Sequence, residues 1–160
     1  MEIRQVCRDD AEAIAEIYAP IVCETTISFE EVPPDASEIA KRIASITATH
    51  PWLVAVDGSL IGYAYAKEFR ARAAYRWSVE CSVYVREGAR GHGVGGALYC
   101  ALFERLRSAE VHAVFTGIAL PNDASIALHR SRGFEPVGIY REVGYKFDRW
   151  IDTSWWQRRL

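Results

Sequence analysis

The pattern of hydrophobic and polar positions predicts four helices. In four segments the apolar residues recur every three or four positions, the spacing that buries one face of a helix. The predicted helices span residues 11–22, 35–47, 93–108 and 122–132. Asp9 is expected to cap the first helix, with Glu12 completing a capping box, and Pro20 is expected to kink or end it.

Seven other segments are predicted to be strands, of which residues 77–85 alternate most clearly. The odd-numbered positions from Val79 to Val85 are apolar and face one way, and the even-numbered positions, including Glu80, face the other. Asp57-Gly58 signals a hairpin turn. The predicted strands span residues 3–7, 52–56, 60–66, 77–85, 111–119, 134–140 and 150–158. Strands before and between helices, with at least one hairpin, predict a mixed α/β sheet.

Composition and charge narrow the class of protein. The 160 residues are 50% hydrophobic and 25% charged, which suits one globular domain over residues 1–160. The net charge of −2 gives no basic field for nucleic acid or an anionic membrane, so neither is expected as a partner. We find neither a run of about 20 apolar residues, as a membrane helix needs, nor a signal peptide.

The cysteines indicate no metal or redox site. Cys7, Cys23, Cys81 and Cys100 are widely spaced, without a C-x-x-C pair, and lie among apolar residues. We expect buried, reduced thiols and no bound metal. Reduced thiols without a signal peptide suggest a cytoplasmic protein.

A glycine-dense loop after the clearest strand carries the strongest functional signal. It joins that strand to the third predicted helix, and free backbone N–H groups at a helix N-terminus suit a phosphate. Gly91, Gly93 and Gly96 match G-x-G-x-x-G, but five residues separate strand and first glycine, a spacing unlike that of a dinucleotide-binding fold. No Lys-Ser or Lys-Thr follows, so a Walker loop is also disfavoured. The alternative is that the loop is a flexible turn that binds no ligand.

Another pattern fits this loop better. Arg90-Gly91-His92-Gly93-Val94-Gly95 matches R/Q-x-x-G-x-G/A, the pyrophosphate loop of the GCN5-related N-acetyltransferases (GNAT). Nearly the whole chain resembles their phosphinothricin and methionine sulfoximine N-acetyltransferase branch. The matching pieces are His50–Ala55, Gly62–Ala66, Ala71–Trp77, Glu80–Val85, Leu120–Ser125, His129, Gly133-Phe134 and Trp156-Gln157. The resemblance implies the GNAT fold, a largely antiparallel mixed sheet flanked by about four helices.

The resemblance implies acetyl-CoA as donor and a primary amine as acceptor. The backbone of the strand would pair with the pantetheine arm, and the loop amides would hold the pyrophosphate. Asn122 and Ser125 match positions near the cofactor at the next helix. The implied cofactor-binding residues are Val83, Tyr84, Val85, Arg90, Gly91, His92, Gly93, Val94, Gly95, Gly96, Asn122 and Ser125.

Two residues match catalytic positions of the family. Attack needs a neutral amine, and Glu80 stands at the position of the general base that would take its proton. The alternative is a solvated glutamate on a one-sided sheet. His129 replaces the tyrosine that protonates the leaving thiolate in many relatives; it could do the same, or simply pack in the helix or contact the cofactor.

Four residues match acceptor-binding positions of the family. Members of the family are usually homodimers, so the resemblance also implies a homodimer. Arg72 and Tyr75 precede the strand of Glu80, Phe29 lies in an early loop, and Lys146 lies in a segment that resembles a pocket rim. A guanidinium suits a carboxylate or phosphinate. We therefore expect an N-acetyltransferase for a small amino-acid-like amine, with L-phosphinothricin and L-methionine sulfoximine leading. A protein N-terminus or other amine, a non-catalytic acyl-CoA sensor and a nucleotide-binding regulator are the alternatives.

Overall fold

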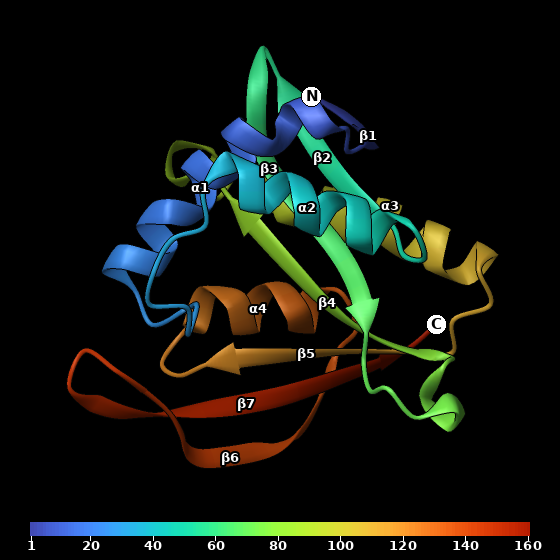
Figure 1. Ribbon diagram of the computed structural model, residues 1–160. Helices are drawn as coiled ribbons and strands as arrows, with labels where there is room; N and C mark the ends of the chain where they lie inside the picture. The colour runs from blue at the N-terminus through green and yellow to red at the C-terminus, as the bar shows by residue number, and fades with distance from the viewer.

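Alternating apolar residues build a seven-stranded sheet in the computed structural model, which describes residues 1–160 (Figure 1). The strands are β1 (Glu2–Gln5), β2 (Trp52–Asp57), β3 (Ser59–Glu68), β4 (Ser78–Val85), β5 (Ala113–Ala119), β6 (Glu135–Lys146) and β7 (Arg149–Arg159). The helices are α1 (Ala11–Glu24), α2 (Ala36–Thr47), α3 (Val94–Ser108) and α4 (Asp123–Ser131). The predicted type of each of these elements is confirmed.

The strands run in the order β1-β2-β3-β4-β5-β7-β6. Every neighbouring pair is antiparallel except β4 and β5, which are parallel. The predicted mixed, largely antiparallel sheet with four helices is therefore confirmed.

Helices cover both faces of the sheet (Figure 1). On one face, Leu53, Val79 and Cys81 pack in a core with Leu98 and Leu102 of α3. On the other, apolar residues of β2 and β3 pack against α1 and α2; these are Trp52, Val54, Leu60 and Tyr63 with Ile14, Ile17, Ile39 and Ile43. None of the helices combines the length and the apolar character needed to cross a membrane.

The sheet opens between β4 and β5. These strands pair only where Ser78–Glu80 meets Ala113–Phe115, although β4 continues to Val85 and β5 to Ala119. They then diverge, and α4 begins shortly after β5 (Figure 1). The far half of β4 is thus bonded to β3 on one side and to no strand on the other.

The start of α1 corrects the sequence prediction. Asp9 is not the cap: a 3₁₀ turn at Arg8–Asp10 precedes α1, and Asp10 Oδ2 accepts from the Cys7 amide at 2.8 Å. Arg4 donates to both Asp10 carboxylate oxygens, at 2.7 and 2.8 Å, and this ion pair holds the pKa of Asp10 below its usual range. Pro20 does not end the helix, which continues to Glu24.

Two further expectations were wrong. The strand predicted to end at Tyr140 continues to Lys146, so that β6 and β7 form a long hairpin. Only Cys81 is buried; the other three thiols are free and exposed because they lie at the 3₁₀ turn and on the outer faces of α1 and α3.

Candidate active site

A groove of about 400 Å³ lies between the free half of β4, the glycine loop and α4. Ile21 of α1 and Ile27 of the α1–α2 loop also line it. The structure brings together every predicted cofactor-binding residue in its lining except His92. His92 is exposed, and its Nδ1 lies 2.8 Å from the Arg90 carbonyl oxygen within the loop.

The glycines give the loop a backbone that other residues would strain. Gly91 and Gly93 have φ angles of +79° and +80°, and a Cβ at either would meet no atom within 4 Å. Gly93 is the N-cap of α3 and offers no side-chain acceptor to the first amides of the helix. Those amides, from Val94 to Gly96, therefore stay available at the positive end of the helix dipole.

The free edge of β4 forms the other wall. Because β5 has diverged, the backbone groups of Val83 and Val85 that face away from β3 have no partner strand. An extended chain could pair with such an edge as an added strand. The groove therefore combines a site for an extended arm with a site for a phosphate.

A small cavity at the head of this groove contains His129. Its lining includes Val83, Asn122 and Ser125, which also line the groove, and Tyr99 of α3. His129 is 3% exposed; its Nε2 lies 2.7 Å from the Tyr99 hydroxyl and its Nδ1 2.7 Å from the Ser125 carbonyl oxygen.

These contacts define the protonation of His129. A carbonyl oxygen only accepts, so Nδ1 carries the hydrogen and Nε2 of the neutral ring accepts from Tyr99. Burial lowers the pKa of His129 below its usual value, which favours the neutral ring. The sequence gives no sign of this partner, because Tyr99 lies 30 residues away and belongs to the apolar stripe of α3.

Glu80 lies on the face of the sheet opposite α3, at the point where β4 and β5 separate. Its register partners are Lys67 of β3 and Phe115 of β5. The Glu80 side chain is 25% exposed, and its Oε1 lies 3.4 Å from Lys67 Nζ. It lines neither the groove nor the small cavity, so it stands beside the predicted cofactor site rather than inside it.

The predicted acceptor-binding residues come from three separate segments. Arg72 and Tyr75 are exposed in the β3–β4 loop, and the Tyr75 ring meets Phe69 edge-on at 5.8 Å. Phe69 stacks on Phe115 at 4.3 Å, which links this loop to the neighbour of Glu80. The position of Phe69 could not be predicted, because a lone aromatic residue after a strand gives no spacing signal.

Phe29 and Lys146 lie together on the other side, but only Phe29 is exposed. Its ring lies against Gly144 of β6, 2.4–2.9 Å from where a Cβ would stand. Lys146 was expected at a pocket rim, and the structure instead buries it to 4% exposure, with its ammonium on three backbone carbonyls.

No cluster of three or more His, Cys, Asp or Glu side chains is placed to hold a metal.

Comparison with known proteins identifies the family. A family model described as the acetyltransferase (GNAT) domain matches residues 3–155. The phosphinothricin N-acetyltransferase of Alcaligenes faecalis is 45% identical, over 99% of this chain and 82% of that protein. The L-methionine sulfoximine/L-methionine sulfone acetyltransferase of Pseudomonas paraeruginosa is 40% identical, over 99% of this chain and 94% of that protein.

Solved structures give the same result. A ribosomal-protein-alanine N-acetyltransferase from Brucella melitensis superposes with a TM-score of 0.97 at 38% identity, over 100% of both chains. A phosphinothricin acetyltransferase from Sinorhizobium meliloti in complex with AcCoA has a TM-score of 0.95 at 41% identity, over 99% of this chain and 88% of that chain. The chain therefore belongs to the GNAT family of acetyltransferases, in the branch that includes the phosphinothricin and methionine sulfoximine N-acetyltransferases.

Proposed function

We propose that the protein transfers an acetyl group from acetyl-CoA to the primary amine of a small amino-acid-like acceptor such as L-phosphinothricin or L-methionine sulfoximine. The observation that carries the proposal is the groove between the free edge of β4 and the α3 N-terminus, with Glu80 on the same strand. The named activities of the relatives support the same reaction.

The groove residues fit acetyl-CoA, which supplies the acetyl group as a thioester. The backbone of Val83 and Val85, which no strand pairs on this edge, would bond the pantetheine arm; the Val85 carbonyl oxygen accepts from Arg90 Nε at 3.2 Å and would exchange that bond for the arm. The amides of Gly91 to Gly96 would hold the pyrophosphate, with Arg90 beside them. Asn122 and Ser125 cap α4 through the Asn122 Oδ1 bond to the Ser125 amide, at 3.2 Å, and so fix the opposite wall.

Glu80 is proposed to act as the general base. The acceptor amine is mostly protonated near neutral pH and must lose a proton before its nitrogen can bond to the acetyl carbon. Glu80 takes this proton, directly or through water, and the neutral nitrogen then bonds to the acetyl carbon. The C–S bond breaks, CoA leaves as the thiolate, and the nitrogen gives its second proton to water. Its position beside the end of the β4–β5 pairing supports this role, because the free edge of β4 begins one residue later.

His129 is proposed to hold the cavity rather than to protonate the thiolate. Its Nε2 lone pair is occupied by the Tyr99 hydroxyl, and its only N–H is bonded to the Ser125 carbonyl oxygen. Both contacts support the alternative that His129 packs inside the protein and transfers no proton. The thiolate then leaves unprotonated or takes a proton from solvent.

The acceptor is proposed to lie on the Glu80 face of the sheet, between the β3–β4 loop and the α1–α2 loop. Arg72 has no carboxylate partner, so its guanidinium is free to bind the acceptor's carboxylate or phosphinate. Tyr75 and Phe29, each about half exposed, would form the aromatic walls.

A homodimer and a cytoplasmic location are also proposed. The edge strand β6, the turn after it and the start of β7 expose large apolar side chains, which a second copy would cover. They are Val137, Ile139, Tyr140, Val143, Tyr145, Phe147 and Trp150. Free thiols support a reducing compartment.

A protein N-terminus is the second candidate acceptor. The similarity to the Brucella ribosomal-protein-alanine N-acetyltransferase, at 38% identity over the full chain, favours it. Arg72 argues for a small anionic acceptor instead, because an N-terminal peptide offers no carboxylate next to the amine.

The test is release of CoA thiol from acetyl-CoA. The arms contain L-phosphinothricin, L-methionine sulfoximine, a peptide with an N-terminal alanine, or no acceptor. Release that depends on either amino-acid mimic would support the proposal, and release with the peptide alone would assign the second candidate. A folded protein that binds acetyl-CoA without releasing thiol in any arm would favour the sensor.

A further inference from the structure

Lys146 is a buried cation whose hydrogen bonds all go to backbone carbonyls, and its Nζ also lies 5.1 Å from the centre of the Phe147 ring. Its Nζ donates to the carbonyl oxygens of Val22 at 2.6 Å, Thr25 at 2.9 Å and Ser28 at 2.7 Å. An ammonium group has three hydrogens, so these bonds use all of them. It is 4% exposed and forms no ion pair, and this burial lowers its pKa below the usual value.

The three carbonyls belong to the end of α1 and the loop that follows. Val22 lies in the last turn of α1 and Thr25 is its C-cap, where carbonyls lack helical partners and the helix dipole favours a cation. Lys146 stands more than 115 residues further along the chain, on β6. One side chain therefore joins the β6–β7 hairpin to residues 22–28.

Ser28 is held a second time through its side chain. Its hydroxyl lies 2.7 Å from the Tyr18 hydroxyl, and its Oγ accepts from the Glu30 amide at 3.1 Å. Tyr18 donates to Glu30 Oε1 at 3.0 Å, so its hydroxyl accepts from Ser28. The carbonyl of Ser28 is thus bonded to β6 and its hydroxyl to α1.

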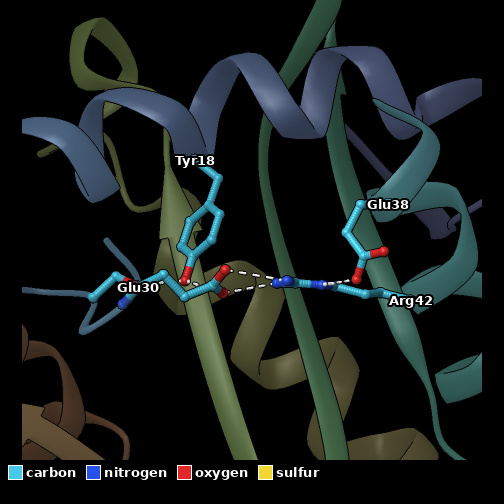
Figure 2. Close-up of polar contacts among 5 residues, drawn as sticks. Tyr18, Glu30, Glu38 and Arg42 are labelled. Carbon is cyan, nitrogen blue, oxygen red and sulfur yellow. Dashed lines mark hydrogen bonds and ion pairs between the residues drawn. The ribbon is translucent and has the colours of Figure 1, made fainter. Parts of the chain in front are cut away.

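Glu30 extends the same network to α2, as Figure 2 shows. Arg42 donates to both Glu30 carboxylate oxygens, at 2.7 and 3.1 Å, and to Glu38 at 3.1 Å. The segment 25–30 is therefore attached to α1 through Tyr18, to α2 through Arg42 and to β6 through Lys146. We call this segment the anchored loop.

The anchored loop carries one residue beside the proposed acetyl-CoA groove, Ile27, and one in the proposed acceptor site, Phe29. Ile27 lines both the groove and the small cavity, and Phe29 rests on Gly144, two residues from Lys146. Ser28 lies between them. Whatever holds Ser28 therefore also sets where Ile27 and Phe29 stand.

We propose that Lys146 is a positioning residue: its ammonium fixes the anchored loop as a wall of the acceptor site and does not itself bind the acceptor. This inference rests on the proposed function. Because all three hydrogens are in use, contact with an acceptor would require Lys146 to abandon a buried carbonyl, which is costly when nothing replaces the bond. Its location on the β6–β7 hairpin makes that hairpin part of the acceptor site.

The test compares Lys146→Met with Lys41→Met, a control at an exposed lysine on α2. Methionine keeps most of the length and removes the charge. We expect the amides of Ile27 and Glu30 to exchange hydrogen at least about tenfold faster in Lys146→Met, without ligand. The acceptor KM should rise about tenfold while kcat changes less, since Glu80 is untouched. Lys41→Met should match the wild type in every reading.

The outcomes separate this inference from the proposed function. A raised acceptor KM with unchanged exchange of the loop amides would identify Lys146 as an acceptor ligand and overturn the proposal, as would no change in either reading. If Lys146→Met fails to fold, Lys146→Gln is measured instead, because its amide keeps two hydrogens. Hydrogen exchange of the loop amides at the wild-type rate in Lys146→Gln would overturn the proposal. A wild-type protein without acceptor-dependent thiol release would refute the proposed function, while the exchange experiment would still decide the role of Lys146 in the loop.

Discussion

At the scale of single residues, Glu80 should separate catalysis from binding. Glutamine has nearly the same shape as glutamate but cannot take a proton. We expect Glu80→Gln to lower kcat by about 100-fold or more, the usual contribution of a general base. Binding of acetyl-CoA should stay within about twofold, because Glu80 does not line the groove. An assay of CoA thiol release measures kcat, and equilibrium titration with acetyl-CoA measures its binding.

The control for this variant is Glu68→Gln, at the exposed end of β3. It removes the same charge from the same region and should leave both quantities unchanged. Near-normal turnover of Glu80→Gln would remove Glu80 from the mechanism.

Arg72 should affect the acceptor and not the donor. Replacing Arg72 with alanine removes a guanidinium that has no carboxylate partner in the protein, so folding should hardly change. We expect the acceptor KM to rise about tenfold or more, as for loss of a charge-assisted hydrogen bond, with an unchanged KM for acetyl-CoA. Arg70→Ala, two residues away, is the matched control; equal losses for both substrates would point to misfolding.

His129 should contribute to acid sensitivity. Burial lowers its pKa, so in weakly acidic solution the unfolded chain binds more protons than the folded protein. The stabilisation from a neutral His129 is complete above about pH 6.5 and is lost as pH falls through the lowered pKa. His129→Phe should be less stable by about 1–3 kcal/mol at pH 7.5, because Tyr99 loses its acceptor.

Urea unfolding at pH 7.5 and 5.5 tests this reasoning. The free energy of unfolding should fall less between the two pH values in His129→Phe than in the wild type. His50, whose pKa burial also lowers, is present in both proteins and cancels in the comparison. An identical fall in both would show that His129 does not titrate in this range.

At the scale of elements, the glycine loop should bind phosphate through its backbone shape. Gly93→Ala puts a methyl group at φ +80° and into open space that the groove occupies. The left-handed conformation should cost roughly 1–2 kcal/mol of stability. Gly58→Ala, in the β2–β3 turn at φ +71°, also with open space, suffers the same strain far from the groove.

The two alanine variants should therefore lose similar stability and differ in acetyl-CoA binding. We expect the KM for acetyl-CoA to rise about tenfold in Gly93→Ala, as displacement of a helix-terminus anion contact suggests, and to stay unchanged in Gly58→Ala. Equal KM values would mean that the phosphate is held elsewhere.

The elements that local periodicity encodes could be predicted from the sequence. Residues 77–85 alternate because one side of β4 packs on α3, and residues 39–46 show helical spacing because α2 covers the other face of the sheet. The groove proposed for acetyl-CoA was also predictable, since its glycines and its strand are consecutive. The hairpin after Tyr140 was not, because Glu142, Phe147 and Asp148 turn the chain at positive φ without glycine.

Contacts between distant segments could not be predicted. The partner of His129 lies 30 residues away and the three carbonyls on Lys146 lie 118 to 124 residues away. Lysine is seldom buried, so a family motif alone suggested a pocket rim. Its true surroundings follow from how the β6–β7 hairpin lies against α1, which is a property of the whole fold.

At the scale of the whole molecule, the edge strand β6 should decide the oligomeric state. Its exposed apolar residues would be a liability for a monomer, because an uncovered edge invites association. We expect a mass of twice the 18.0 kDa of one chain by light scattering at micromolar concentration. Ile139→Lys puts a charge in the middle of this strand and should yield monomers that remain folded, since Ile139 is 47% exposed in one chain.

The same variant shows how far the acceptor site depends on assembly. The β6–β7 hairpin also carries Lys146 and Gly144, which hold the anchored loop. If a second copy stiffens the hairpin, monomeric Ile139→Lys should have a raised acceptor KM, and its affinity for acetyl-CoA should change less, because Ile27 is the only residue of the anchored loop that lines the groove. A monomeric variant with wild-type kinetics would show that one chain holds its hairpin in place without a partner. A wild-type protein that stays monomeric at all concentrations would refute the proposed homodimer.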